Sequence, residues 1–273
     1  SSSGVINYQN IPRDNKDIKK MFKAREGYKI VQGDLKTAEV YYAAVLSNDE
    51  FLQKAFVEKL DFHSYVAKNM FKLDCAVGEV KDLYPDLRQY SKAITFGILY
   101  GAGPSKISET ANITMEEAKD FIKKYFREAS SLRKWIDACL STIETNYFIY
   151  SAFGRKRRLP EVGSDNKGVA AHAARSGLNF LIQSVASDIN IYGLIDTVNW
   201  VKENKLQDDI KLFATVHDSV VAEVKNELLP LYAKTLVTNL QKDRGVFITG
   251  CPIVVDVEAG TSWGELSKYE LPK

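Results

Sequence analysis

The sequence predicts an α+β protein, within the broad α/β class, in which a sheet-forming lobe is interrupted by a helical insertion. Segments with strand character occur towards both ends of the chain, and a largely helical pattern fills the middle. The sequence also contains no internal repeat and no low-complexity segment. We therefore expect one sheet-based lobe, built from segments that are distant in the sequence.

The expected strands carry acidic residues where they end. The segment YKIVQGD, from Tyr28 to Asp34, is typical of a short strand ending in an acid. The segment LFATVHDSVVAEV indicates two apolar strands that meet near His217 and Asp218. A last helix-then-strand unit ends in CPIVVDVEAG. Asp34 and Asp218 thus occupy positions from which a strand can present a carboxylate rigidly to solvent.

The expected helices are bounded by recognisable start and stop signals. A helical pattern runs from the first strand through Leu46, and from Asp49 to about Ala129 the pattern is mostly helical. It is punctuated by Pro85, by Gly101 to Pro104, and by the capping-box-like TMEE at Thr114 to Glu117. The remaining segments are a polar, turn-rich stretch over 1–27, a basic turn-rich stretch over 153–167, and a long helix over about 168–204.

Composition excludes several classes of protein. Of the 273 residues 45% are hydrophobic and 26% charged, which is ordinary for a soluble globular protein. No apolar run approaches the roughly 18 to 20 residues of a membrane span, and no signal-peptide pattern opens the chain. The three cysteines, Cys75, Cys139 and Cys251, form no Cys-x-x-Cys pair, which argues against a disulfide framework or a structural zinc site. We expect a cytoplasmic location and no membrane partner.

The net charge of +2 is small, but the cations are clustered. One cluster is GRKRR, from Gly154 to Arg158, and a second lies between Phe121 and Lys134, where cations alternate with aromatic residues. Such runs are commonly solvated turns or helix faces, and phosphate contacts are the alternative. The choice between a solvated surface and a phosphate-binding surface depends on the neighbouring motifs.

A mixed stripe of cations and rings lies on one expected helix. Residues four apart project from nearly the same helix face, so the stripe is about 18 Å long. Its members are Arg88, Lys92, Phe96 and Tyr100. A surface that binds polyphosphate at one end and an aromatic base at the other needs this order, whereas an amphipathic core helix with snorkelling cations is the alternative. Gly97 and Gly101 each cost about 1 kcal/mol of helix stability, so we expect close approach of a base or a neighbouring backbone there.

The pattern Arg88-x-x-x-Lys92-x-x-x-Phe96-Gly97-x-x-Tyr100-Gly101 resembles motif B of the DNA polymerase I family, also called family A. The resemblance implies a fingers helix that binds the incoming deoxynucleoside triphosphate. Arg88 and the catalytic Lys92 would contact the triphosphate. Phe96 would contact the sugar and base region, and Tyr100 the templating position.

Two further motifs imply a metal site. GDLKTAEVYY, from Gly33 to Tyr42, is similar to motif A, with Asp34 in the catalytic position and Glu39 as a gate against the 2′-hydroxyl. VHDS is similar to motif C, with His217 near the primer end and Asp218 as second catalytic carboxylate. The resemblance implies that Asp34 and Asp218 bind two Mg²⁺ ions. Read alone, an aspartate after a strand is more often a turn former or a helix cap.

The remaining matches imply contacts to nucleotide and DNA. His63 of the DFH segment resembles a histidine that touches the triphosphate. The residues implied to bind primer-template are Arg175, Asn179 and Gln183 at the minor groove, His217 at the primer end, Gln9, Asn10 and Arg13 of YQNIPR, and Arg155 and Arg157 of GRKRRLPEV.

The sequence also departs from the family pattern. Ser219 stands where the family usually has an acid, Leu35 to Thr37 replace a Tyr-Ser-Gln run, and Tyr41 replaces an arginine. Ser219 and the segment FGILYGAG are similar to the phage branch of the family.

The resemblance implies a right-hand palm, an antiparallel sheet backed by helices, with inserted helical fingers and without a thumb. Its parts would be 1–75 (palm, motif A), 76–170 (fingers, motif B) and 171–273 (palm, motif C). The implied activity is template-directed transfer of dNMP from dNTP to a primer 3′-hydroxyl, with an N-terminal portion or separate chain supplying thumb and exonuclease. The alternatives are a single-subunit RNA polymerase, against which Glu39 argues, and a non-catalytic DNA-binding subunit.

Overall fold

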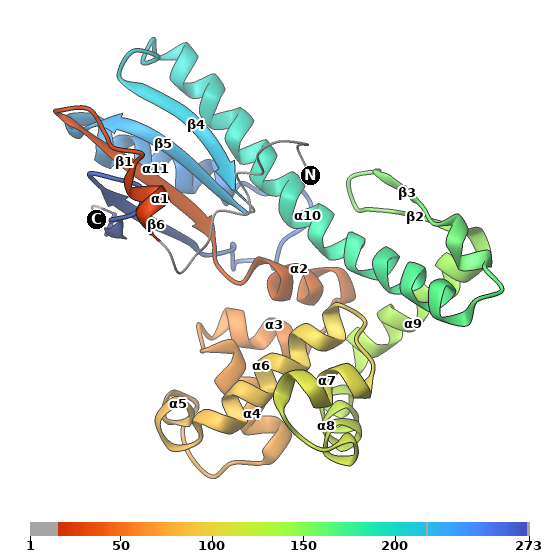
Figure 1. Ribbon diagram of the computed structural model, residues 1–273. Helices are drawn as coiled ribbons and strands as arrows, with labels where there is room; N and C mark the ends of the chain where they lie inside the picture. The colour runs from red at the N-terminus through yellow and green to blue at the C-terminus, as the bar shows by residue number, and fades with distance from the viewer. Residues whose placement is uncertain (1–15, 217, 272–273) are drawn as a thin grey trace. The chain divides into compact units, whose positions relative to one another are not determined.

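The computed structural model describes residues 16–216 and 218–271, which divide into two compact units (Figure 1). Within the described residues, the first unit comprises 16–38, 186–216, 218–244 and 252–271. The second comprises Glu39–Val185 and Gly245–Cys251. These boundaries differ from the expected ones near 75 and 170, because the helices that follow the first strand pack with the helical unit.

The first unit contains a five-stranded sheet in which every pair of neighbours is antiparallel, with the order β4-β5-β1-β6-β7. The strands are β1 (Tyr28–Leu35), β4 (Ile210–Val216), β5 (Ser219–Lys225), β6 (Val255–Gly260) and β7 (Ser267–Lys268). Strands from both ends of the chain thus form one sheet, as the sequence predicted. The strand β1 lies at its centre, between β5 and β6.

A close approach of helix α11 (Leu229–Leu240) fixes the position of β1. A Cβ atom at Gly33 would lie 2.6 Å from Cδ2 of the fully buried Leu236, so only glycine fits without movement. On β1 and β5, the buried Ile30 and Val221 pack with Trp263. The short helix α1 (Asp17–Lys20) precedes β1. The sheet is therefore firmly packed one residue before Asp34.

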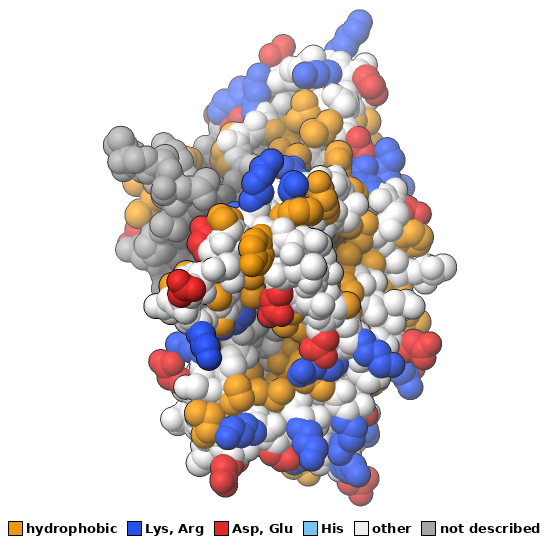
Figure 2. All heavy atoms as spheres, turned by 90° about the vertical axis from the view of Figure 1, so that its right-hand side faces the viewer, with side chains coloured by type: hydrophobic (Ala, Val, Ile, Leu, Met, Phe, Trp, Pro, Cys, Tyr) orange, Lys and Arg blue, Asp and Glu red, His pale blue; other side chains and the backbone are white. Residues whose placement is uncertain are grey.

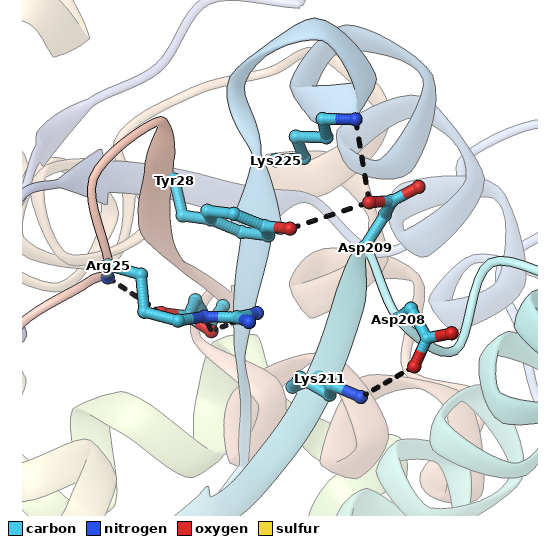
Figure 3. A network of polar contacts seen from close by, with 7 residues as sticks. Arg25, Tyr28, Asp208, Asp209, Lys211 and Lys225 are labelled. Atoms are coloured by element: carbon cyan, nitrogen blue, oxygen red, sulfur yellow. Dashed lines mark hydrogen bonds and ion pairs between the residues drawn. The ribbon is translucent and has the colours of Figure 1, made fainter.

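A polar network holds the start of β1 (Figure 3). Nε of Arg25 donates to Glu223 over 2.9 Å, and the guanidinium lies 4.1 Å from the ring centre of Tyr28. The Tyr28 hydroxyl donates to Asp209 over 3.4 Å, and Lys225 forms an ion pair with the same carboxylate at 3.5 Å. Each of these partly exposed contacts contributes little by itself. Together they join β1, β5 and the turn before β4 in a single register.

The second unit is a helical bundle with one small hairpin. Its helices are α2 (Ala38–Ser47), α3 (Glu50–Val57), α4 (Phe62–Phe71), α5 (Val80–Leu83), α6 (Pro85–Leu99), α7 (Pro104–Ala111), α8 (Met115–Glu128) and α9 (Ser130–Asn146). The hairpin consists of β2 (Phe148–Tyr150) and β3 (Lys156–Arg158). Pro85 occupies the first turn of α6, and the predicted capping box is confirmed at the start of α8, where Thr114 accepts from the amide of Glu117.

A buried aspartate joins the two ends of this bundle. Asp49 caps α3 by accepting from the amide of Leu52, and its other oxygen accepts from the amide of Leu132 in α9, 2.9 Å away. Only 2% of Asp49 is exposed. Leu52, Leu132 and Ile94 of α6 lie in one buried cluster, so α3, α6 and α9 share a core.

The long helix α10 (Lys167–Glu203) confirms the expected helix over 168–204 and contributes residues to both units. Its C-terminal part belongs to the first unit, where Gly193 leaves room for Leu240 of α11 and Asn190 donates to Thr215 of β4. Its N-terminal part belongs to the second unit and carries Arg175. None of the helices in the described ranges combines the length and the apolar character that crossing a bilayer requires.

Candidate functional site

Two predicted site carboxylates lie on neighbouring backbone segments of the sheet. Asp34 is the last residue but one of β1 and lies opposite Ser219 of β5. The amide of Leu35 donates to the carbonyl oxygen of Asp218 over 3.3 Å, so Asp218 lies beside the end of β1. Both aspartates are half-buried. The structure therefore brings Asp34 and Asp218 together, although 184 positions separate them in the sequence.

A third acid lies on the other side of Asp34. Asp256 of β6 is the cross-strand neighbour of Asp34, and directly opposite residues of an antiparallel pair share a face of the sheet. The ammonium group of Lys36 lies 3.9 Å from the carboxylate of Asp256. The sequence analysis missed Asp256, since the pairing register of β1 and β6 cannot be read from either strand alone.

The serine that replaces the usual acid has a packing role. Ser219 is 3% exposed, and its hydroxyl donates to the carbonyl of Val216 over 2.8 Å. This bond links the first residue of β5 to the last residue of β4, next to Asp218. Serine fits this buried position because it is small and its hydroxyl has a hydrogen-bond acceptor.

The stripe on α6 is present as predicted, with one difference at its end. The helix ends at Leu99, and Tyr100 is its C-terminal cap. Phe96 stacks on Tyr100 with ring centres 6.1 Å apart, and the ring of His63 lies 5.7 Å from that of Phe96. Lys92 is exposed. Cations and rings thus follow each other along one side of the second unit.

His63 is buried close to the cations of the stripe. It is 7% exposed, and its Nδ1 has no hydrogen-bond partner in the part of the chain that the structure describes. Burial lowers the pKa of His63 to about 4; the carboxylate of Asp61 opposes this shift, while Arg88 and Lys92 add to it. The ring is therefore neutral near pH 7.

Glu39 of α2 accepts hydrogen bonds from two other predicted site residues. The Tyr100 hydroxyl donates to one carboxylate oxygen over 2.5 Å, and the side-chain amide of Gln183 donates to the other over 3.5 Å. Burial, followed by this hydrogen bond to Glu39, raises the pKa of Tyr100 above its usual value. The sequence placed these three residues in separate motifs, and the structure connects them.

The two glycines at the end of α6 allow close packing. A Cβ at Gly97 would lie 2.7 Å from Ile107 of α7, and a Cβ at Gly101 would lie 2.7 Å from the stem of Arg175. Gly101 also has φ of +67°, which favours glycine. Side chains of neighbouring helices thus approach both positions closely. Arg175 and Asn179 are half-buried on α10, and Gln183 is exposed.

The two basic clusters differ in the contacts that their cationic side chains make. In the cluster at 121–134, Lys124 pairs with Asp120 and Arg133 pairs with Asp137, as in an ordinary solvated helix face. In the hairpin, Lys156 lies 3.7 Å from the ring centre of Phe148. Arg157 is exposed, and within the described residues it takes part in no ion pair. On the face drawn in Figure 2, cationic side chains lie beside apolar ones.

Gln9, Asn10, Arg13 and His217 lie outside the described residues. Arg155 is described, and its amide donates to the hydroxyl of Ser151.

The model of one protein family covers nearly the whole chain: the family described as DNA polymerase family A matches residues 1–265. The chain belongs to DNA polymerase family A. The resemblance read from motif B is confirmed.

Relatives in family A include phage and bacterial enzymes. The DNA polymerase of Escherichia phage T5 is 44% identical over 287 residues, which cover 96% of this chain and 34% of the relative. DNA polymerase I of Caldicellulosiruptor bescii is 30% identical over 267 residues, covering 97% of this chain and 30% of the relative. The similarity to the phage branch is thus confirmed. The chain spans about a third of the length of these curated relatives.

A solved structure confirms the predicted fold class. The POL domain of Pol1 from M. smegmatis, in complex with DNA primer-template and dNTP, has a TM-score of 0.84 and 29% sequence identity. The match covers 94% of this chain and 44% of that chain. The predicted combination of an antiparallel sheet with inserted helices is therefore correct.

In this family A chain, Tyr41 has a role that the sequence left open. Tyr41 is 2% exposed; its hydroxyl donates to the carbonyl of Cys251 over 2.8 Å and accepts from the amide of Ile248. It holds residues 245–251 to α2, within the second unit.

Proposed function

We propose that the chain is the catalytic portion of a template-directed DNA polymerase, which transfers dNMP from a dNTP to a primer 3′-hydroxyl. The observation that carries the proposal is the adjacency of Asp34 and Asp218 in a family A sheet. The proposed palm is the sheet unit, and the proposed fingers are the helical unit. We propose further that this is the C-terminal portion of the enzyme, with thumb and exonuclease supplied by the same or a separate chain.

Asp34 and Asp218 would hold the divalent cations. Family A polymerases use divalent metal ions, generally Mg²⁺. The donors fit this ion, since carboxylate oxygens are its preferred protein ligands. In the described ranges, no group of three or more His, Cys, Asp or Glu side chains is arranged to hold a metal, so the pair needs further ligands from phosphates or water. Mg²⁺ held by these two carboxylates would lower the pKa of the attacking hydroxyl and neutralise charge on the departing pyrophosphate.

The nucleotide would be held by the stripe on α6. Arg88 and Lys92 would bind the triphosphate, because charge-assisted hydrogen bonds to phosphate are strong and strengthen as charge develops on the leaving group. The neutral ring of His63 adds a hydrogen-bonding group beside them. Phe96 and Tyr100 would contact the sugar and base. Glu39, held by Tyr100 and Gln183, would crowd a 2′-hydroxyl and favour deoxyribose.

Primer-template would be bound along α10 and the hairpin. Arg175, Asn179 and Gln183 project from successive turns of α10, and would reach minor-groove acceptors that all correctly paired bases share. Arg155 and Arg157 would contact phosphates without reading sequence. The Pol1 structure from M. smegmatis, which contains primer-template and dNTP, supports both assignments by its similarity.

The test is primer extension by the chain, alone and together with the remainder of the polymerase. Asp34→Ala and Asp218→Ala should each abolish extension while DNA binding persists. Asp208→Ala is the matched control, since Asp208 is an exposed acid paired with Lys211. Extension that is indifferent to both Asp34 and Asp218 would contradict the proposed catalytic pair.

The RNA polymerase alternative is tested in the same assay. Incorporation of ribonucleotides at the rate of deoxyribonucleotides would support it. Family A membership and the two donors that hold Glu39 favour deoxyribonucleotides.

A further inference from the structure

An acid and a base of the second unit form a two-bond pair beside the proposed triphosphate site. Nε of Arg88 donates to Oδ2 of Asp61 over 2.8 Å, and Nη2 donates to Oδ1 over 2.9 Å. Burial of Asp61 opposes its ionisation, but the bonds from Arg88 and Ser64 hold the pKa of this carboxyl well below its usual range. The pair is therefore ionised throughout the range in which a polymerase works.

The pair occupies only one edge of the guanidinium group. A guanidinium has five N–H donors in a fixed planar fork. Asp61 accepts from Nε and from one hydrogen of Nη2, along the side of the fork. The two hydrogens of Nη1 and the second hydrogen of Nη2 form the end of the fork. Within the described residues, no side chain accepts a hydrogen bond from Nη1 of Arg88.

Both members of the pair are themselves held in place. Asp61 is the N-cap of α4, and its Oδ2 also accepts from the amide of Ser64 over 2.9 Å. Ser91, one turn after Arg88, is fully buried and donates to the carbonyl of His63 over 2.7 Å. Two links, Asp61 to Arg88 and His63 to Ser91, thus join the start of α4 to α6. The guanidinium is oriented before any ligand arrives.

Two further nitrogen groups lie close to the pair along α4 and α6. Lys92 lies one turn after Arg88, is exposed, and takes part in no ion pair within the described residues. Among the described residues, Nδ1 of the buried His63 has no hydrogen-bond partner. An unpaired ammonium, a buried ring nitrogen without a partner and the end of a guanidinium fork are together suited to a multiply charged oxyanion.

We infer that Asp61 is a positioning residue, which holds the side of the Arg88 fork so that its end binds a phosphate group of the incoming nucleoside triphosphate. This inference rests on the proposed function. Asp61 itself does not touch the nucleotide. It removes the freedom of a long side chain that would otherwise have to be ordered when the nucleotide binds.

The opposite effect, competition between Asp61 and phosphate for Arg88, is the alternative. A carboxylate that occupied the end of the fork would have to leave before a phosphate could bind two N–H groups. Asp61 occupies the side instead, so both anions can bind Arg88 at once. The sign of the effect follows from this geometry: loss of the pair weakens nucleotide binding.

The experiment compares Asp61→Asn, Asp61→Ser, Arg88→Ala and Asp82→Asn by equilibrium binding of a fluorescent deoxynucleoside triphosphate to the protein–primer-template complex. Asn and Ser preserve the N-cap of α4, and neither preserves the charged two-bond pair. Asp82→Asn is the control, since Asp82 is an exposed acid on the neighbouring α5. We expect Asp61→Asn and Asp61→Ser to raise Kd and KM about three- to tenfold with kcat within about twofold, as for a side chain that must be ordered on binding. Asp82→Asn should leave Kd unchanged.

A double-mutant cycle separates positioning from a general effect on the fold. In an Arg88→Ala background, Asp61→Asn should have no further effect on Kd. If Asp61→Asn leaves Kd unchanged or lowers it while Arg88→Ala raises it, the inference is wrong and the proposed nucleotide site stands. An equal rise in Kd in both backgrounds also overturns it. If Arg88→Ala itself leaves Kd unchanged, Arg88 does not bind the nucleotide, and this part of the proposed function is wrong.

Discussion

Tyr100 donates a hydrogen bond of 2.5 Å to Glu39, a residue that lies 61 positions earlier in the chain. The bond joins the end of the cation and aromatic stripe to the proposed sugar gate. Its short length and its carboxyl acceptor place it among the strong hydrogen bonds of proteins.

Loss of this bond should relax sugar selection. Glu39→Ala removes the gate, so incorporation of ribonucleotides relative to deoxyribonucleotides should rise strongly, with some loss of overall rate. Tyr100→Phe leaves Glu39 with only the longer bond from Gln183, and should lower the discrimination about tenfold. Competing rNTP and dNTP incorporation measures both. Unaltered discrimination in Glu39→Ala would contradict the gate.

Lys92→Ala should raise the nucleotide concentration needed for half-maximal rate and also slow the chemical step. One charge-assisted contact to phosphate is lost, so kcat/KM should fall on the order of 10- to 100-fold. Single-turnover primer extension at increasing dNTP concentration measures both quantities. Lys106→Ala is the control, since Lys106 is an exposed lysine paired with Glu109 on α7. If Lys92→Ala has the same kinetics as the unaltered chain, the proposed contact between Lys92 and the triphosphate is wrong.

Ser219→Asp should destabilise the sheet, although it introduces the residue type that the family usually has there. The position is 3% exposed and lies opposite Asp34, so a new carboxylate would be buried beside another acid. The free energy of unfolding should fall by roughly 2 kcal/mol or more. Urea unfolding measures it, with Ser219→Ala as the reference for loss of the hydroxyl alone. A stability equal to that of Ser219→Ala would contradict the prediction.

His63 should make the fold less stable in mild acid. Its pKa is about 4 in the folded chain and about 6.5 when unfolded, so between these values the unfolded chain binds the extra proton. Stability should therefore fall as the pH decreases from about 6.5 to 4, by an amount on the order of 3 kcal/mol, and this loss should level off below pH 4. The free energy of unfolding in urea is measured as a function of pH for the wild type and for His63→Gln. Parallel curves would show that His63 does not carry the effect.

Gly33→Ala should strain the sheet next to Asp34. The new methyl would lie 2.6 Å from Leu236, so either β1 or α11 must move, at a cost of about 1 to 3 kcal/mol. Leu236→Ala should relieve part of this cost in the double variant. Gly78→Ala is the control, because among the described residues no atom beyond the chain neighbours of Gly78 lies within 4 Å of a Cβ there. Additive effects of the two substitutions would argue against the contact.

Much of the fold could be predicted from local signals. Three such signals are the short strand segment before Asp34, the capping box at Thr114 and the proline that opens α6. Each acts within a few residues, so the sequence reveals it. The stripe from Arg88 to Tyr100 could be predicted for the same reason, since helix geometry fixes the spacing. Its last member is a cap rather than a helical residue, because Gly101 takes a left-handed conformation.

The interactions that orient the site could not be predicted. Asp61 has an evident local function as N-cap, and nothing in its neighbourhood indicates that it also binds Arg88. Asp256 lies opposite Asp34 only in one of several registers that its strand allows. Gly97 indicated that some group packs closely against α6. That this group is Ile107 could not be predicted, because it depends on how α7 packs against α6.

The strand β4 has a consequence for behaviour at high concentration. It is the last strand on its side of the sheet, and its pairing with β5 is irregular between Leu212 and Ala214. A bulge there interrupts the even row of amide and carbonyl groups that a foreign strand would need for docking. In a concentrated preparation, fibril growth by strand addition at β4 should consequently be slower than along a regular edge strand.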